Sequence, residues 1–189
     1  WFVNGTFVSA DDDLTGGAFD KGDVVTVEAS PWDGIQAGAT LTSAAITVSN
    51  TAPSVVGVQI LPGAPTAASV LTAVPLGAHD PDPADVITWG TSWSVNGSPV
   101  STAATLTGAD FGRGDLVTVT ITPSDGEAQG APVTSGPVVV GNTPPSLSGA
   151  SIQPDPAFVS EPYLEAVAAG WADLDGDAEG YVYAWAVNG

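Results

Sequence analysis

Cysteine and methionine are both absent from this chain of 189 residues, and only two residues are basic. Without cysteine there can be no disulfide bridges, no thiolate ligands for a metal and no cysteine nucleophile. No apolar run approaches the roughly 20 residues of a membrane-spanning helix, and no signal peptide is visible. We therefore expect no membrane insertion in this window. We also expect packed apolar cores, and not disulfide bridges, to stabilise the fold.

The scarcity of basic residues leaves a formal net charge of −19, from 21 acidic and 2 basic side chains. A surface of this charge repels the phosphates of nucleic acids and of anionic membranes. Neither is expected as a partner. The acidic excess suits solubility, a salty habitat or the binding of divalent cations, and the sequence does not choose between them.

One phrase recurs at a fixed spacing: WFVNG, WSVNG and WAVNG begin at positions 1, 93 and 185, so they are 92 residues apart. Longer phrases follow the same spacing, such as FDKGDVVTV with FGRGDLVTV and SNTAPS with GNTPPS. A period of this length corresponds to a whole small domain. We expect a complete domain at 51–142, the C-terminal part of another at 1–50 and the N-terminal part of a third at 143–189. Because the chain opens and closes on the same phrase and has no Met, we expect a window cut from a longer protein.

The fold class follows from alternating apolar residues and from the 23 Gly and 16 Pro that interrupt them. Val117, Val119 and Ile121 alternate with threonines, and similar runs surround 56–60, 71–73, 86–95 and 138–140. The run at 86–95 has a counterpart at 181–187. About seven short strands per period, separated by turns, are typical of an antiparallel immunoglobulin-like β-sandwich. We therefore predict an all-β array of such domains.

The recurring phrase is explained by a turn and a core side chain. Asn followed by Gly is favoured where both central residues of a hairpin turn need positive φ, which predicts tight turns at Asn4-Gly5 and Asn96-Gly97. Trp93 and Trp185, which begin the second and third copies of the phrase, are expected to be buried between two sheets. NGT at 4–6 and NGS at 96–98 also match the N-glycosylation sequon, so that interpretation stays open.

The chain resembles a known group of proteins in these phrases. DPDPADVITWGTSWSVNG, its partner DLDGDAEGYVYAWAVNG and the KGD and NTxP phrases are similar to tandem PKD-like or immunoglobulin-like repeats of large bacterial and archaeal cell-surface proteins. The resemblance covers essentially the whole chain and implies an extracellular, multi-domain, β-rich protein. Such modules serve as stalks, adhesins and spacers beside secreted enzymes, so it does not identify a partner.

The acidic segment DLDGD, at 173–177, gives the most specific indication of a binding site. Asp173, Asp175 and Asp177 stand at alternate positions, and Gly176 allows a sharp bend. Calcium loops gather hard oxygen ligands from closely spaced carboxylates in this way, although the twelve-residue EF-hand pattern is not matched. We predict a calcium site here. A solvated acidic turn is the alternative interpretation.

The partner loop carries Asp80, Asp82 and Asp85, with two prolines among them and alanine where the glycine stood. The same two interpretations apply to it. Glu161 or Glu165 is a candidate further ligand for the first loop.

The two basic residues, Lys21 and Arg113, are 92 positions apart, and each precedes Gly-Asp. Each could bridge to a carboxylate on a neighbouring strand or on the next domain. Alternatively, each belongs to an exposed pair contributing at most about 1 kcal/mol, and we favour this second interpretation. RGD at 113–115 leads directly into a strand and has KGD as its counterpart, so we do not expect integrin-type adhesion.

Nothing in the sequence supports catalysis. The single histidine, His79, has no histidine counterpart and no nucleophile phrase beside it, and repeated turn aspartates do not form the concave site that would separate carboxylate pKa values. We expect no enzyme. The favoured function is a structural element of an extracellular stalk or filament, whose partners are neighbouring repeats and copies of itself in a fibre. The alternative is an adhesin that binds a glycan or a partner cell, for which the non-recurring Trp32 and Trp171 are the candidate exposed aromatics.

Overall fold

The structure is a computed structural model that describes residues 1–187. Strands hold 39% of the residues and helix 2%, and the sheets are antiparallel, so the all-β fold class is confirmed. Within residues 1–187, no helix is both long and apolar enough to span a membrane.

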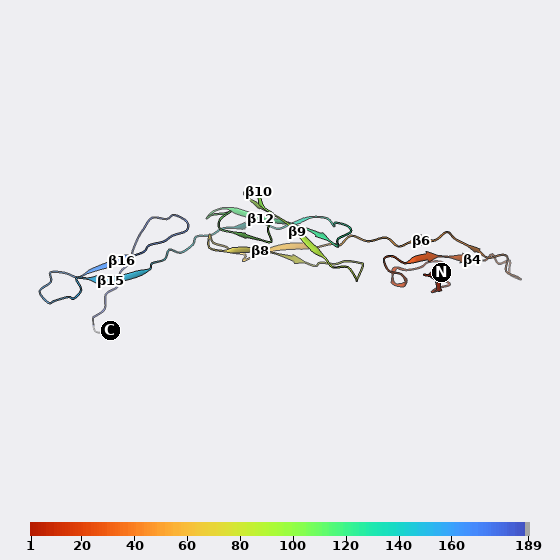
Figure 1. Cartoon of the computed structure of the whole chain (residues 1–189), viewed down its shortest axis with the longest axis horizontal. Coiled ribbons are helices and arrows are strands. Elements are labelled where there is room, and N and C mark those ends of the chain that lie inside the picture. Colours follow the sequence, from red (N-terminus) through yellow and green to blue (C-terminus); the bar gives the residue numbers. More distant parts are fainter. Residues whose placement is uncertain (188–189) are drawn as a thin grey trace. The chain divides into compact units, whose positions relative to one another are not determined.

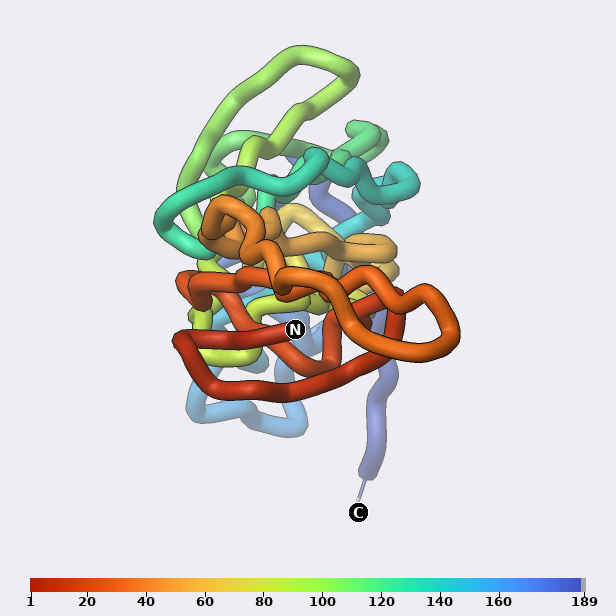
Figure 2. Tube along the Cα trace, turned by 90° about the vertical axis from the view of Figure 1, so that its right-hand side faces the viewer, coloured from red at the N-terminus to blue at the C-terminus, as the bar shows by residue number. Residues whose placement is uncertain are grey.

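The first 50 residues form short strands, and their trace turns back on itself several times (Figure 2). They make a sheet in the order β2-β1-β3-β6 and a separate pair, β4-β5. The elements are β1 (Phe2–Val3), β2 (Thr6–Phe7), the 3-10 turn η1 (Gly16–Ala18), β3 (Val24–Thr26), β4 (Glu28–Ala29), β5 (Leu41–Thr42) and β6 (Ile46–Thr47).

The longest strands lie in the middle of the chain (Figure 1). One sheet has the order β10-β9-β12-β13, with β14 also paired to β12, and a second has the order β11-β8-β7. The strands are β7 (Gly57–Leu61), β8 (Val70–Leu76), β9 (Thr88–Val95), β10 (Ser98–Ser101), β11 (Thr105–Thr107), β12 (Leu116–Ser124), β13 (Val133–Thr134) and β14 (Val138–Val139). All five apolar runs singled out between 56 and 140 therefore coincide with strands.

The C-terminal part forms one antiparallel pair, β15 (Gly149–Gln153) with β16 (Glu165–Ala169). Two predictions are wrong here. Residues 181–187 form no strand, and Trp185 is 54% exposed instead of buried. In the described part of the chain no second sheet covers β15 and β16, so Trp185 has no core to enter.

By their contacts the described residues fall into two units. Unit 1 holds Trp1–Gly57, Pro75–Gly90 and Ile121–Val133, and unit 2 holds Val58–Val74, Thr91–Thr120 and the residues from Thr134 onward. The boundaries expected from the sequence period, at 50/51 and 142/143, stay a prediction.

The core of unit 2 draws side chains from both sheets of the middle segment. Trp93 on β9 and Leu71 on β8 are fully buried, and the Trp93 indole donates a hydrogen bond to the carbonyl of Ala103 at 3.0 Å. On β12, Val117 and Val119 are fully buried while the threonines between them are not, as the alternation predicts. The predicted burial of Trp93 is confirmed.

Both predicted hairpin turns are present. Asn4 and Gly5 have φ of 50° and 78°, and Asn96 and Gly97 have 50° and 80°, which is the conformation that asparagine and glycine tolerate best. The turn also explains why the spacing from Asn-Gly to the later Gly-Asp is the same in both repeats: the Asn96 side-chain amide donates to Asp115 at 2.7 Å, and the Asn4 side-chain amide donates to Asp23 at 2.7 Å.

The RGD triplet is part of this same turn structure. Asp115 accepts a hydrogen bond from the Gly112 amide at 2.8 Å as well as the one from Asn96. The Asp115 carboxylate therefore stabilises the turn directly before β12. The Asn96 and Asn4 side chains likewise stabilise the turns, because each amide oxygen also accepts a hydrogen bond from a backbone amide, that of Leu116 and that of Val24.

Candidate functional site

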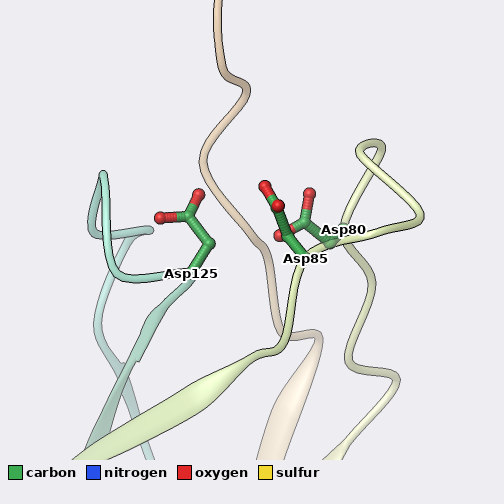
Figure 3. Close-up of side chains that lie close together, drawn as sticks. All are labelled: Asp80, Asp85 and Asp125. Atoms are coloured by element: carbon green, nitrogen blue, oxygen red, sulfur yellow. The ribbon is translucent and has the colours of Figure 1, made fainter. Parts of the chain in front are cut away.

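Two loops of unit 1 bring carboxylates together. Asp80 and Asp85 lie in the loop between β8 and β9, and Asp125 lies in the loop after β12 (Figure 3). Carboxylate oxygens of the three residues lie within 4.8 Å of one another. The Asp125 side chain is held by its own loop, because it accepts hydrogen bonds from the amides of Glu127 and Ala128, both at 2.7 Å.

Lys21 is the cation of this cluster. Its ammonium group donates to Asp85 at 2.7 Å, to Glu127 at 2.6 Å and to the side-chain carbonyl of Asn50 at 2.9 Å. The Lys21 and Asp85 side chains are only 24% and 16% exposed, so water screens this pair less than an ordinary surface pair. The hydrogen bond to Asp85, followed by that to Glu127, raises the pKa of Lys21, which therefore stays charged.

The same arrangement recurs in unit 2. Arg113 donates to the side chain of Asn142 at 2.6 Å and pairs with Asp177. The Lys21–Asp85 and Arg113–Asp177 pairs both span 64 residues of sequence. Both basic residues of the chain thus bind a carboxylate of the next acidic loop, as the first interpretation expects. The Arg113 and Asp177 side chains are 42% and 39% exposed, so the second interpretation, an exposed pair of small energy, stays a prediction for this pair.

A second bond in each network ties the acidic loop to the Asn-Thr phrase. The Thr51 amide donates to Asp82 at 2.7 Å, and the Thr143 amide donates to Asp175. Asp82 is 8% exposed. This bond draws Asp82 toward the backbone of the phrase, and Asp82 does not belong to the cluster of Asp80, Asp85 and Asp125.

The second cluster matches the prediction more closely. Carboxylate oxygens of Asp173, Asp175 and Asp177 lie within 4.8 Å of one another. Among the described residues, neither Glu161 nor Glu165 joins them.

Three buried carboxylate oxygens of these loops have no hydrogen-bond partner: Oδ2 of Asp80, Oδ2 of Asp173 and Oδ1 of Asp175. A buried oxygen of this kind is costly to leave unpaired, and oxygen is the ligand that calcium prefers. The donor set therefore fits a calcium ion, and it fits best at Asp173 and Asp175, which contribute two of the three oxygens.

Asp125 was not among the site residues predicted from the sequence. Its only signal was the recurrence of Asp-Gly in SDG at 124–126 and WDG at 32–34. That pattern is also what an ordinary turn shows. The approach of Asp125 to Asp80 and Asp85 depends on how β9 and β12 are paired, which no local pattern reveals.

Acid should weaken unit 1 through Asp125. Hydrogen bonds from Ala128 and then from Asn50 lower the pKa of Asp125 to about 2. A carboxyl group whose pKa is lower in the folded state than in the unfolded state stabilises the fold at pH values above its unfolded-state pKa of about 3.9. That stabilisation is lost as the pH falls toward the folded-state pKa. We expect the melting temperature, followed by circular dichroism, to stay level between pH 7 and 5 and to fall between about pH 4 and 2.

Asp125→Asn is the matched variant, because its amide keeps an oxygen acceptor but does not titrate. It should show a smaller fall over the same pH range. An identical acid profile in this variant and the wild type would contradict the assignment.

The two non-recurring tryptophans differ in environment. Trp32 is 65% exposed on a loop with Pro31 and Gln36, which line a hollow of about 250 Å³. Trp171 instead packs edge-to-face on Tyr181, with ring centroids 5.8 Å apart. Of these two tryptophans, only Trp32 is largely exposed.

Comparison of the chain with protein-family models, with curated proteins and with solved structures finds no match.

Proposed function

We propose that the chain is a structural module of an extended extracellular stalk or filament, built from tandem immunoglobulin-like sandwich domains of the PKD-like kind. The observation that carries this proposal is the recurrence of the basic-to-acidic bridge. Lys21 and Arg113, 92 positions apart, each bind the acidic loop that follows the next Asn-Thr phrase.

Such a bridge limits bending at a junction. With boundaries at 50/51 and 142/143, each bridge joins the last part of one domain to the first loop of the next. The Thr51–Asp82 bond at 2.7 Å and its Thr143–Asp175 counterpart fasten the connecting segment itself. A junction held at two points, with proline just after it, is stiffer than a free linker.

The shape of a polypeptide with several consecutive periods tests this function. Small-angle X-ray scattering should give a maximum dimension that grows linearly with the number of periods, as in a stiff rod. Replacing the basic residue of every period by methionine removes the bridge and should shorten the mean dimension. A dimension that grows only as the square root of the number of periods would indicate freely jointed domains and contradict the proposal.

Calcium is the proposed further ligand of these junctions. Asp173, Asp175 and Asp177 would hold it, and the cluster of Asp80, Asp85 and Asp125 would hold a second ion beside Lys21. Support comes from the unpartnered buried oxygens of Asp80, Asp173 and Asp175. Each cluster has three carboxylates and a single Lys or Arg beside them, and a divalent ion would balance the remaining negative charge.

Adding calcium should raise the melting temperature of the chain. A ligand that binds only the folded state stabilises it by about 2.7 kcal/mol when its concentration is 100 times Kd, and extracellular modules have Kd of about 0.1–1 mM. Differential scanning calorimetry at 10 mM calcium measures the shift. The double variant D173N/D175N is the control and should shift less. No heat on titration and no thermal shift in the wild type would reject the ion while leaving the stalk function intact.

Adhesion to a glycan is the second candidate, and Trp32 is the observation that favours it. An open indole face beside Asp33 and Gln36 is a suitable platform for a sugar ring. Binding to a glycan array that is lost in Trp32→Ala would transfer the assignment to this alternative.

A further inference from the structure

One sheet of the middle segment has no charged side chain. Its strands β11, β8 and β7 contain no Asp, Glu, Lys or Arg, and none of these residue types occurs anywhere in 51–79. The chain as a whole is strongly acidic, with a net charge of −19. Two copies of the chain therefore repel each other least where they meet through this sheet.

The strand β7 is an outer edge of the sheet. The strand order is β11-β8-β7, so β7 is paired on one side only. Among residues 1–187, no backbone hydrogen bond from a turn or loop reaches Gly57–Leu61. The N–H and C=O groups on the outer side of β7 are therefore free to pair with a further strand.

The other edges of the two middle sheets are short or interrupted. β10 contains Pro99, and its register shifts between Pro99 and Ser101, and both features disturb pairing at an edge. β11 has three residues, and β13 and β14 have two each. β7 has five residues with no proline and no charge, so it is the edge best suited to pairing.

We propose that β7 of one copy of the chain pairs antiparallel with β7 of a second copy across a two-fold axis. Each strand then meets an identical strand, so the contact is complementary to itself. The two three-stranded sheets form one continuous sheet. This pairing depends neither on calcium nor on the stalk function, because it uses only the edge of one sheet.

The register that centres the pair places Gln59 opposite Gln59 and Val58 opposite Ile60. Residues directly opposite each other in an antiparallel pair point to the same side of the sheet. Val58 and Ile60 are 9% and 2% exposed on the core side, whereas Gln59 between them is exposed. The register therefore keeps every side chain on its own face, and the two Gln59 amides can donate to and accept from each other.

The counterpart of β7 in the next period is β15, and its sheet does carry a charge. Glu165 on β16 stands directly opposite Gln153 on β15. Joining two copies of that sheet would bring two glutamates toward each other, so the pairing is assigned to β7.

Analytical ultracentrifugation of the whole chain tests the pairing with two variants, Gln59→Lys and Gln59→Glu. The wild type should form concentration-dependent dimers. Each variant alone should associate about fivefold more weakly, because two like charges would stand directly opposite each other. An equimolar mixture of the variants should associate at least as tightly as the wild type, because Lys then faces Glu.

The net charge separates this local effect from general repulsion. Gln59→Lys makes the chain less negative and Gln59→Glu makes it more negative, yet both should weaken the dimer. Val139→Lys changes the net charge as Gln59→Lys does, at a residue of β14 that is 58% exposed. This control should dimerise at least as tightly as the wild type.

Hydrogen exchange of the wild type gives a second readout that needs no substitution. Backbone amides of β7 should exchange more slowly as the protein concentration rises, while those of β14 should not change. The proposal would be overturned by a monomeric wild type, by a Gln59 variant that dimerises as tightly as the wild type, or by a mixture that associates no better than its components. Exchange at β7 that does not depend on concentration would overturn it as well.

Discussion

Replacing Trp93 by alanine is expected to lower the free energy of unfolding by about 3–5 kcal/mol, as truncation of a large core side chain does. Trp93 is 0% exposed, and its indole also satisfies the carbonyl of Ala103. Alanine would leave both a cavity and a carbonyl without its partner. Urea unfolding followed by circular dichroism measures the change.

Trp32→Ala is the matched control, because it removes the same side chain from a site that is 65% exposed. Its effect should stay within about 0.5 kcal/mol, the range of ordinary surface substitutions. Equal losses in the two variants would show that Trp93 is not the centre of the core.

Gly108→Ala should cost about 1–3 kcal/mol, the usual range for an overpacked site. A Cβ at Gly108 would lie 1.9 Å from the carbonyl oxygen of Ala67. The clash is with backbone, so no side-chain rotation relieves it, and the chain around Ala67 or the end of β11 must move.

Gly112→Ala separates this clash from the general effect of replacing glycine. A Cβ at Gly112 meets nothing within 4 Å, and its φ lies outside the left-handed region. The variant should therefore change the free energy of unfolding by no more than about 0.5 kcal/mol. If Gly108→Ala were equally mild in urea unfolding, the close approach to Ala67 would be wrong.

The features that could be predicted from the sequence are those determined by neighbouring residues. The turns at Asn4-Gly5 and Asn96-Gly97 form because their φ angles are set by the residues at the turn itself. The alternation of Val117, Val119 and Ile121 with threonine predicts a strand with one buried face, since successive side chains of a strand point to opposite sides. The all-β class follows from several such runs.

The site was only partly predictable. The close spacing of Asp173, Asp175 and Asp177 was sufficient to predict their cluster, because a short bent loop cannot separate them far. In the partner loop the same argument placed Asp82 beside Asp80 and Asp85, yet Asp82 binds the Thr51 amide and Asp125 takes its place in the cluster.

By itself, the sequence determined the strands, the hairpin turns and the places where acidic residues gather, since each depends on residues a few positions apart. Only the tertiary structure decided which carboxylate meets Lys21 or Arg113, because each of those pairs spans 64 residues. It also decided that Trp93 is buried while Trp185 is 54% exposed, although both stand in the same phrase. Burial requires a second sheet over the side chain, and that sheet comes from a distant part of the chain.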